Sequence, residues 1–534
     1  MHRDNREGRS DDGRWDVIVI GAGLAGLTAA LHLAERGLTP LILEADPNKP
    51  GGRLKAGPTV QFDHKGRSWR FAGEHGVHGV WSPYRNLQAL WARHGIRPVL
   101  VPAQEESWVL GVGRHVRRAP IGSAIRESWI PAPLHYLGLL GRPAFWRMLD
   151  LRDIAAMLPI FVTLMTALSI DPLAENQPLQ GMTLADVCKG WSPRMTALFT
   201  GLSRNALPAN PDEIPASGFF AFLRFYTLRR RDAWAFSYLP DPAPEALVVP
   251  LVDALNLTLR RGQSGELRLG ARVKRFWRDA GGWTVAWTQQ GEGDVVTTET
   301  ARCRHLIMAT DAPAAGALLR ECPDTAPACD ALRLPTGWPS AVLRFWFDRQ
   351  PPRGESEAGI LSGDFVLDNF FWLSRIYNDY IAWGRATEGS AVETHIYGPP
   401  ELLAQPDATL LALAQADLAR VWPTLKGHVI HASLARNDAT HTLLRAGQPH
   451  EHPGVRTPWP HLLCCGDWVR DESPAMFMER ACVTGIKAAN AILHERGLPT
   501  WPLLPHGAAE PLAWALELQM SAIRSRLRQW RARA

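Results

Sequence analysis

Residues Asp16–Glu44, DVIVIGAGLAGLTAALHLAERGLTPLILE, decide the fold of this chain. The β-branched run Asp16–Ile20 predicts a buried parallel strand, and an Ala/Leu-rich helix follows it to about Arg36. A second apolar strand, Pro40–Leu43, ends at Glu44. This order is a complete βαβ unit whose first turn has the G-x-G-x-x-G spacing of a dinucleotide site. A glycine-rich turn in another kind of α/β protein would leave the strand, helix and acid in this register unexplained.

The three glycines of the turn have separate tasks. Gly21 permits the tight turn, Gly23 lets the backbone approach a pyrophosphate, and Gly26 lets helix and strand pack closely. Leu24 and Ala25 open the helix, and the N-terminal end of a helix favours negative charge. The turn is therefore predicted to hold the pyrophosphate of a dinucleotide.

Two further features follow this unit. Glu44, with the adjoining Ala45, stands where an acid accepts hydrogen bonds from the adenosine ribose. Gly51-Gly52-Arg53 suits a second loop folded over the pyrophosphate, because glycines allow close approach and a guanidinium offers a bidentate fork. A dehydrogenase that binds only NAD needs no such second clamp. The alternative for Arg53 is an ordinary solvated loop arginine.

The C-terminal part of the chain contains a second informative segment, His461–Leu493, HLLCCGDWVRDESPAMFMERACVTGIKAANAIL. A short apolar strand is predicted to reach Gly466-Asp467, and a loop containing Pro474 follows it. A helix is predicted from about Met476 onward. A strand, a loop and a helix are therefore expected in this order near this end of the chain.

The E…GGR order and the GD…helix segment resemble the FAD-dependent superfamily of amine oxidases and phytoene desaturases. The resemblance implies a non-covalent FAD in a discontinuous domain built from both ends of the chain. Gly52 and Arg53 would cover the pyrophosphate, and Gly466 and Asp467 would contact the ribityl–phosphate region. The backbone at Met478 would point the helix N-terminus at the flavin N1/O2 edge, where a reduced flavin is negatively charged.

Another motif combines glycine and histidine: FAGEHGVHGVW, Phe71–Trp81, before a helix predicted over Tyr84–His94. Its EHG-x-HG…Y-x-NL pattern resembles carotene desaturases of the zeta-carotene desaturase and isorenieratene synthase type more than amine oxidases. That resemblance lays Gly76 and Val77 along the flavin ring and makes His78 the catalytic side chain nearest the reacting carbon. Alternatively, the histidines only order the loop. No further ligands lie nearby in the sequence, so no metal site is expected.

The middle of the chain returns to an α/β pattern. A helix is predicted near 245–260, strands near Glu266–Trp277, Gly282–Gln289 and Asp294–Thr300, and a returning strand over 305–308. By resemblance, the backbone of Val273 would pair with the adenine, and Ala309 and Thr310 would meet the cofactor.

These features predict an α/β (α+β) two-domain flavoprotein with a Rossmann-like FAD domain of the glutathione-reductase/p-hydroxybenzoate-hydroxylase type. The FAD domain is expected over 15–90, 245–334 and 458–500, and a discontinuous substrate domain of antiparallel sheet and helices over 91–244 and 335–457. A disordered leader is expected over 1–14, and a basic amphipathic helix over 508–534.

The composition limits the function. A net charge of +5 is too small to indicate nucleic-acid binding, and the excess is concentrated in the acid-free tail after Glu517. No zinc or disulfide spacing appears among the seven cysteines, Cys188, Cys303, Cys322, Cys329, Cys464, Cys465 and Cys482. Free thiols of this kind fit a reducing cytoplasm.

Two apolar segments indicate contact with a membrane surface. Ile154–Ile170 is uncharged, but its helix would reach only about 25 Å, short of a hydrocarbon core of about 30 Å, and Pro159 interrupts it. It is expected either to dip into one leaflet or to be buried. The C-terminal helix presents an apolar stripe of Leu512, Leu516, Met520, Ile523, Leu527 and Trp530 beside arginines. It predicts a surface anchor or a helix packed against protein.

The second stretch of the expected substrate domain is rich in aromatic residues. They are Trp338, Phe345, Trp346, Phe347, Phe365, Phe370, Phe371, Trp372 and Trp383. Alternation over Ala341–Phe347 and Phe370–Ile376 predicts antiparallel strands. Aromatic faces suit an apolar polyene, and an aromatic core is an equal alternative.

The sequence thus predicts an FAD-dependent oxidoreductase, a carotenoid or isoprenoid desaturase that passes hydride from a substrate C–H to flavin N5. Its electrons would go to a quinone or oxygen, at the inner face of the cytoplasmic membrane. No lysine lies between Lys274 and Lys426, where the family's amine oxidases carry one near the flavin. Amine or amino-acid oxidation, flavin-dependent isomerisation and a non-catalytic binding subunit remain alternatives.

Overall fold

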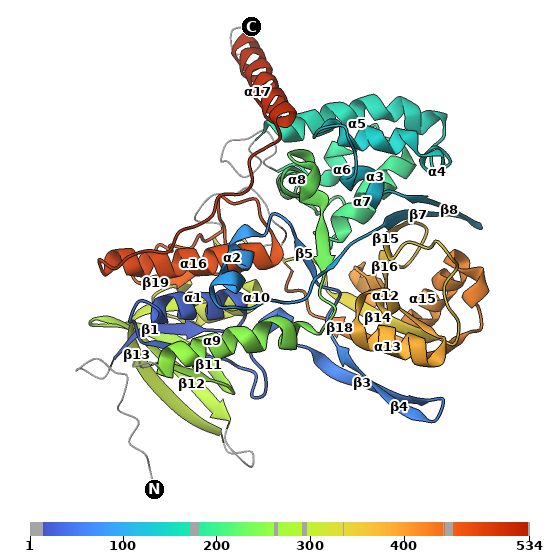
Figure 1. The fold of residues 1–534 in the computed structure, drawn as a ribbon. Helices are drawn as coiled ribbons and strands as arrows, with labels where there is room; N and C mark the ends of the chain where they lie inside the picture. The colour runs from blue at the N-terminus through green and yellow to red at the C-terminus, as the bar shows by residue number, and fades with distance from the viewer. Residues whose placement is uncertain are drawn as a thin grey trace.

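A computed structural model describes residues 14–170, 181–260, 265–290, 296–329, 331–334, 336–441, 443 and 452–531. The predicted leader therefore lies almost wholly outside the described residues. Two seven-stranded sheets organise the rest, one beneath helices α1 and α16 and the other beside α12, α13 and α15 (Figure 1).

The first sheet is built from segments at both ends and in the middle of the chain. Its strands are β1 (Trp15–Ile20), β2 (Pro40–Leu43), β10 (Glu266–Arg268), β11 (Ala271–Asp279), β12 (Gly282–Gln290), β13 (Val296–Met308) and β19 (Leu462–Cys464). Parallel pairing joins β10, β2, β1, β13 and β19, while β11, β12 and β13 form an antiparallel meander. The predictions of β1 and β2 are confirmed.

The strands predicted in the middle of the chain differ from the observed strands in two places. The strand expected over Glu266–Trp277 is two strands, β10 and β11, because Gly270 turns the chain with φ +69°. The strands expected near Asp294–Thr300 and over 305–308 are one strand, β13, which pairs with β12 at its start and with β1 at its end.

Helices cover both faces of this sheet. Val17 and Val19 of β1 face a core shared with α1 (Leu24–Ala34), α9 (Val249–Arg260) and α16 (Phe477–Glu495), whereas Ile18 and Ile20 face α10 (Ala312–Glu321). Alternate burial of β1 residues against two helical layers is the usual arrangement of a central parallel strand. Short elements follow the first unit: β3 (Gly57–His64), β4 (Arg67–Gly73), β5 (Gly79–Trp81), α2 (Arg85–Arg93) and β6 (Val101–Pro102).

The second sheet has the order β18-β14-β17-β16-β15-β7-β8. Its strands are β7 (Glu106–Val112), β8 (His115–Pro120), β14 (Ser340–Phe347), β15 (Ala358–Gly363), β16 (Asn369–Trp372), β17 (Ser390–Ile396) and β18 (Val429–Asn437). It is mixed, not purely antiparallel as predicted, because β15 runs parallel to β7. The strand expected over Phe370–Ile376 stops at Trp372, and α12 (Leu373–Ile376) follows.

The aromatic residues of this region mainly build cores. Phe345, Phe347, Phe370 and Trp372 pack in one buried cluster, and Trp346 and Trp383 pack in another. These six side chains therefore form aromatic cores, which was the alternative to a wall of the substrate cavity. Helices α13 (Asn378–Thr387), α14 (Pro400–Leu403) and α15 (Asp407–Val421) complete this part.

A helical part lies beyond the second sheet (Figure 1). Its helices are α3 (Gly122–Arg126), α4 (Pro143–Trp146), α5 (Leu151–Ser169), α6 (Leu184–Val187), α7 (Pro193–Arg204) and α8 (Ala216–Leu223), and strand β9 (Phe236–Tyr238) returns from it. The C-terminal helix α17 (Pro511–Arg531) packs against α5. Both the apolar helix and the C-terminal helix are thus confirmed as helices.

Candidate functional site

The first glycine turn connects β1 to α1 at the carboxyl edge of the parallel sheet. Gly21 has φ +105°, and a Cβ there would lie 2.9 Å from the Ala309 carbonyl oxygen. At Gly26 a Cβ would lie 2.1 Å from the Gly21 oxygen. At Gly23 the nearest atom would be Gly52 Cα at 3.8 Å, so open space adjoins this residue. Two of the glycines are therefore required by the fold itself, and the third borders a space.

The second glycine loop folds onto the first. Gly51 forms a parallel bridge with Gly23 and donates its N–H to the Ala22 oxygen at 2.8 Å. Gly51 and Gly52 have φ values of +122° and +57°, which favour glycine at both positions. Leu24 and Ala25 occupy the first turn of α1, whose N-cap residue Gly23 supplies no side-chain cap. The first N–H groups of α1 are thus left open to an anion.

Glu44 lies beside this turn. Its Oε2 accepts the Ala22 N–H at 2.8 Å, and its Oε1 accepts the Asp46 N–H at 2.9 Å. The Glu44 backbone oxygen accepts the N–H of Ala271, the first residue of β11, at 2.7 Å. Val273 lies two residues farther along β11, so the structure brings it to the same end of the sheet as Glu44 and Ala45.

The two ends of the chain meet at Arg53 and Asp467, which form an ion pair. Gly466 has φ +141°, and the Trp468 side chain donates from Nε1 to the Thr310 carbonyl at 2.8 Å. Ala309 donates its N–H to the Ile20 oxygen at 2.9 Å. The predicted residues after β13 and β19 therefore adjoin the glycine turn after β1.

Helix α16 begins next to a pair of buried tyrosines. The Met476 N–H donates to the Tyr226 hydroxyl at 3.2 Å, and that hydroxyl lies 3.1 Å from the Tyr84 hydroxyl. Met476, the N-cap residue, supplies no side-chain cap, and Met478 lies in the first turn. The N-terminus of α16 is therefore the second uncapped helix end of the site.

The loop Glu74–Gly79 contains two histidines, His75, which is half-buried, and His78, which is buried. Neither ring nitrogen of His78, which is 9% exposed, has a hydrogen-bond partner among the residues that the structure describes. Its Nδ1 lies 3.7 Å from Glu74 Oε1, an oxygen that accepts the Ala243 N–H at 2.6 Å. Burial lowers the pKa of His75 well below its usual value, so its imidazole is neutral at neutral pH.

A buried polar network behind this loop was not predicted from the sequence. Arg344 donates from Nε to Glu393 Oε2 at 2.8 Å, and Glu393 Oε1 lies 3.0 Å from His395 Nε2. His395 Nδ1 lies 2.9 Å from both Asn369 Nδ2 and the Tyr397 hydroxyl. Burial alone would raise the pKa of Glu393, but Arg344 and His395 lower it to about 2. The carboxylate is therefore ionised and fully paired.

This network touches the predicted flavin loop directly. A Cβ at Gly76 would lie 3.4 Å from His395 Cε1, and Arg344 Nη2 donates to the Glu74 carbonyl oxygen. The sequence does carry a signal for it, since Arg344 and Glu393 are charged residues within strands of mostly uncharged residues. They are cross-strand partners in β14 and β17, a register that the sequence does not show.

These residues fit an FAD. Two uncapped helix N-termini suit its pyrophosphate and its flavin, and Gly23 borders open space. Within the described residues, neither ring nitrogen of the buried His78 has a hydrogen-bond partner. In the part of the chain that the structure describes, all seven cysteines are free and buried, as predicted.

Comparison with known proteins identifies relatives of this chain. It resembles the carotenoid phi-ring synthase of Streptomyces griseus, with 29% identity over 90% of this chain and 88% of that protein. It resembles the 15-cis-phytoene desaturase of Narcissus pseudonarcissus at 22% identity over 90% of this chain and 80% of that protein. Among solved structures, the cyclohexylamine oxidase from Brevibacterium oxydans matches with a TM-score of 0.62 and 17% identity, over 91% of this chain and all of that one.

The similarity to the oxidase shows a shared α/β two-domain flavoprotein fold. The family described as flavin containing amine oxidoreductase matches residues 24–493, which is most of the chain. The match confirms the predicted superfamily and the predicted FAD cofactor, and it makes the chain an FAD-dependent oxidoreductase. The chain belongs to the flavin containing amine oxidoreductase family.

Proposed function

We propose that this enzyme desaturates a carotenoid or a related isoprenoid. The observation that carries the proposal is the similarity, over 90% of the chain, to a protein named carotenoid phi-ring synthase. Phytoene desaturases match over a similar length. The likeness to amine oxidases, at 17% identity, extends to the fold alone.

We propose that the FAD is held non-covalently by residues from both ends of the chain. The pyrophosphate would lie against the two glycine loops, the ribose near Glu44, and the flavin near the start of α16. The proposed contacts are Gly21, Gly23, Leu24, Ala25, Gly26, Glu44, Ala45, Gly52, Arg53, Gly76, Val77, His78, Val273, Ala309, Thr310, Gly466, Asp467 and Met478. The parallel strands with their β11–β12–β13 meander support the glutathione-reductase/p-hydroxybenzoate-hydroxylase subtype.

When bound, FAD supplies a hydride acceptor at flavin N5. Loss of hydride from a carbon next to a polyene leaves a delocalised cation on the substrate, and a neighbouring proton must pass to a base. His78 is the proposed base, because it is buried and neither of its ring nitrogens has a hydrogen-bond partner within the described chain. His395 is excluded from this role, because polar neighbours face both its ring nitrogens.

The Arg344–Glu393–His395 network would position the loop that carries His78. Arg344 binds the Glu74 carbonyl, and the His395 ring backs Gly76. A rigid loop keeps the base in one place and helps to exclude water from the cation.

We propose that the apolar substrate enters from a membrane surface bound by α5 and α17. Exposed apolar side chains gather on these helices and on the segment before α5: Trp129, Leu137, Trp146, Leu151, Ile154, Leu158, Phe161, Val162, Trp514, Leu518 and Ile523. Arg142, Arg147 and Arg152 are exposed in the same part of the chain. Aromatic, aliphatic and basic side chains together suit a membrane interface at the cytoplasmic face.

The two helices form one surface. Arg524 of α17 donates from Nη1 to Ser169 Oγ at the end of α5, at 3.2 Å. By length and composition alone α5 could cross a membrane. Pro159 within it and its packing against α17 favour an in-plane position instead. On α17, Ala513 and Leu516 pack against the protein, so the predicted stripe is divided between protein and surface. The side chains of Leu527 and Trp530 lie outside the described residues.

The visible spectrum of the holoprotein under anaerobic conditions tests this function. The protein would be mixed with micellar acyclic carotene, then with a carotene that has cyclic end groups, and then with a panel of amines. Bleaching of the flavin bands by a carotene is the expected result, and the two carotenes separate chain from ring oxidation. Bleaching by an amine alone would overturn the proposed substrate, and admission of oxygen or a quinone would identify the electron acceptor.

A further inference from the structure

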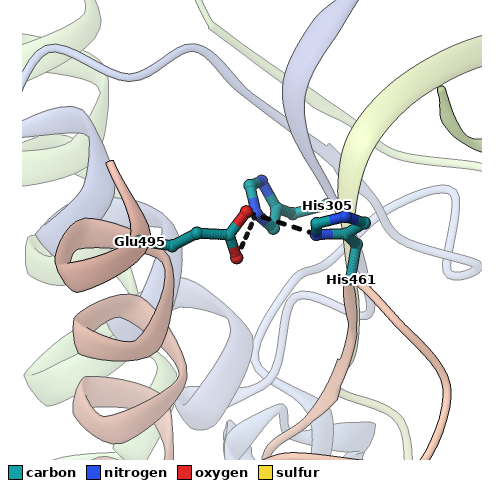
Figure 2. Close-up of side chains that lie close together, drawn as sticks. All are labelled: His305, His461 and Glu495. Carbon is teal, nitrogen blue, oxygen red and sulfur yellow. Dashed lines mark ion pairs between the residues drawn. The ribbon is translucent and has the colours of Figure 1, made fainter. Parts of the chain in front are cut away.

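We propose that His305, His461 and Glu495 form a binding site for a divalent transition metal ion of the zinc type. His305 lies on β13, His461 in the turn before β19, and Glu495 at the last residue of α16 (Figure 2). The histidines are neighbours because the residues after them, Leu306 and Leu462, are paired in parallel strands. Three segments far apart in the sequence therefore bring their ligand atoms to one point.

The spacing of these atoms suits a zinc ion. His305 Nε2 lies 3.1 Å from Glu495 Oε2, and His461 Nδ1 lies 3.3 Å from Glu495 Oε1. All three ligand atoms lie within 4.8 Å of one another. In a tetrahedral site with zinc–ligand bonds of about 2.0–2.2 Å, neighbouring ligand atoms are about 3.3 Å apart. Two imidazoles and one carboxylate are also a ligand set that zinc uses when its fourth position is left to water.

The site has a buried floor and an accessible side. The His305 side chain is 1% exposed, whereas those of His461 and Glu495 are 35% and 34% exposed. His461 also lines a cavity of about 480 Å³ together with Arg304 and Gly282. A metal ion can therefore reach the ligands without any unfolding of the sheet.

The cluster has two energetically unfavourable features. Glu495 ends a helix of 19 residues, where the helix dipole disfavours a carboxylate. His461 has φ +61°, a left-handed conformation that costs energy at a residue other than glycine. A bound dication would offset the first of these costs.

Arg304 is the competing cation. Its Nη2 lies 3.2 Å from Glu495 Oε1, but its side chain is 47% exposed. A half-exposed ion pair of this kind is weak, so the guanidinium can turn toward water when a metal binds.

The proposed metal site is independent of the proposed carotenoid chemistry. In the parallel pairing of β13 with β1, His305 lies opposite Val17, whereas the glycine turn follows Ile20, the last residue of β1. The metal ligands therefore lie away from the end of the sheet that carries the glycine turn. Helix α16 separates Glu495 from the proposed flavin end by about 28 Å, its length at about 1.5 Å per residue. The ion would tie the C-terminal segment to the central sheet at the edge opposite the cofactor.

Equilibrium dialysis of the FAD-loaded full chain against zinc sulfate, after removal of metals with EDTA, tests the proposal. We expect one zinc ion per chain that is lost, or bound at least about tenfold more weakly, in His461→Ala and in Glu495→Gln. Arg304→Gln should bind about fivefold more tightly, because a competing charge is removed. His428→Ala is the matched control, since His428 Nδ1 lies 2.8 Å from Asp348 Oδ1 in a similar pair that lies outside this cluster.

Flavin absorbance of each variant verifies that it has folded. Zinc should also raise the thermal unfolding temperature of the wild-type protein and of His428→Ala, but not of the ligand variants. Cobalt in place of zinc should give absorption bands beyond the flavin bands, a readout that needs no variant. Wild-type protein that binds no more zinc than the double variant His461→Ala/Glu495→Gln would overturn the site.

Discussion

Arg53 and Asp467 form an ion pair that joins the second glycine loop to the strand end before α16. The Asp467 side chain is 11% exposed and that of Arg53 is 35% exposed, so the pair lies at the border of the proposed cofactor site. Each residue is proposed to contact a different part of FAD. The pair therefore holds both groups near the place where the cofactor needs them.

Asp467→Asn should weaken FAD binding by about 10- to 100-fold, because the loss of one charge-assisted hydrogen bond changes the binding free energy by a corresponding amount. Fluorescence of free flavin after dilution measures the dissociation constant. The double variant with Arg53→Gln should show a coupling of only about 1 kcal/mol, because the pair is partly exposed. Full retention of FAD in Asp467→Asn would make the pair a purely structural contact.

Local features of the sequence predicted the first βαβ unit correctly. β1, α1 and β2 depend on apolar runs and on glycines whose conformation is dictated nearby, as at Gly21. The Arg344–Glu393 pair could not be predicted in this way, because it requires the register of β14 against β17. The split between β10 and β11 depends on the positive φ of Gly270, which the surrounding strand pattern concealed.

The two glycines Gly23 and Gly26 should respond differently to substitution by alanine. Gly23 has φ −74°, and a Cβ there meets its nearest described atom at 3.8 Å. Gly23→Ala should therefore fold normally but bind FAD at least about tenfold more weakly, because the methyl group occupies the proposed pyrophosphate position. At Gly26 a Cβ would lie 2.1 Å from a backbone oxygen, so Gly26→Ala should also unfold at lower temperature. Circular dichroism and flavin fluorescence separate the two effects; a yellow Gly23→Ala protein with wild-type affinity would contradict the proposed contact.

Glu479 of α16 caps helix α2 from a buried position. Its two oxygens accept the N–H groups of Asn86 and Leu87, each at 3.0 Å. Glu479→Ala leaves these donors unpaired and should lower the free energy of unfolding by about 3–5 kcal/mol in urea titrations. Glu472→Ala, at an exposed position shortly before the same helix, should change it by less than about 0.5 kcal/mol. Similar effects of the two variants would rule out the capping role.

Glu393 makes stability depend on pH below neutrality. Its pKa is lowered to about 2 in the folded state from an ordinary value near 4.5, so the unfolded chain binds more protons between these values. The stabilisation, about 3 kcal/mol, is therefore complete above pH 4.5 and is lost as the pH falls toward 2. Glu393→Gln should be destabilised at pH 7, because Arg344 is left unpaired, and its difference from wild type should shrink in this pH window. A constant difference across the window would contradict the assignment.

His78→Ala should slow flavin reduction by the substrate by about 10²- to 10⁴-fold, as expected for loss of a positioned base. FAD should stay bound, because other proposed contacts are intact. Stopped-flow absorbance under anaerobic conditions measures the rate. His428→Ala, which removes the pair of His428 with Asp348, serves as the control. An unchanged rate in His78→Ala would leave this histidine with a structural role in its loop.

The proposed membrane-binding surface of the protein can be tested by substituting exposed side chains, without deleting a helix that also packs against the protein. Leu158 and Phe161 are 70% and 42% exposed on α5, and Val99 and Val296, elsewhere on the molecule, are 71% and 63% exposed. Leu158→Ser/Phe161→Ser should reduce co-sedimentation with anionic vesicles at least about tenfold, because each buried side chain contributes about 1.5–3 kcal/mol. Val99→Ser/Val296→Ser removes a comparable amount of exposed apolar surface and should not change it. Equal binding by both double variants would show that α5 and α17 do not form the membrane-binding surface, whatever substrate the enzyme oxidises.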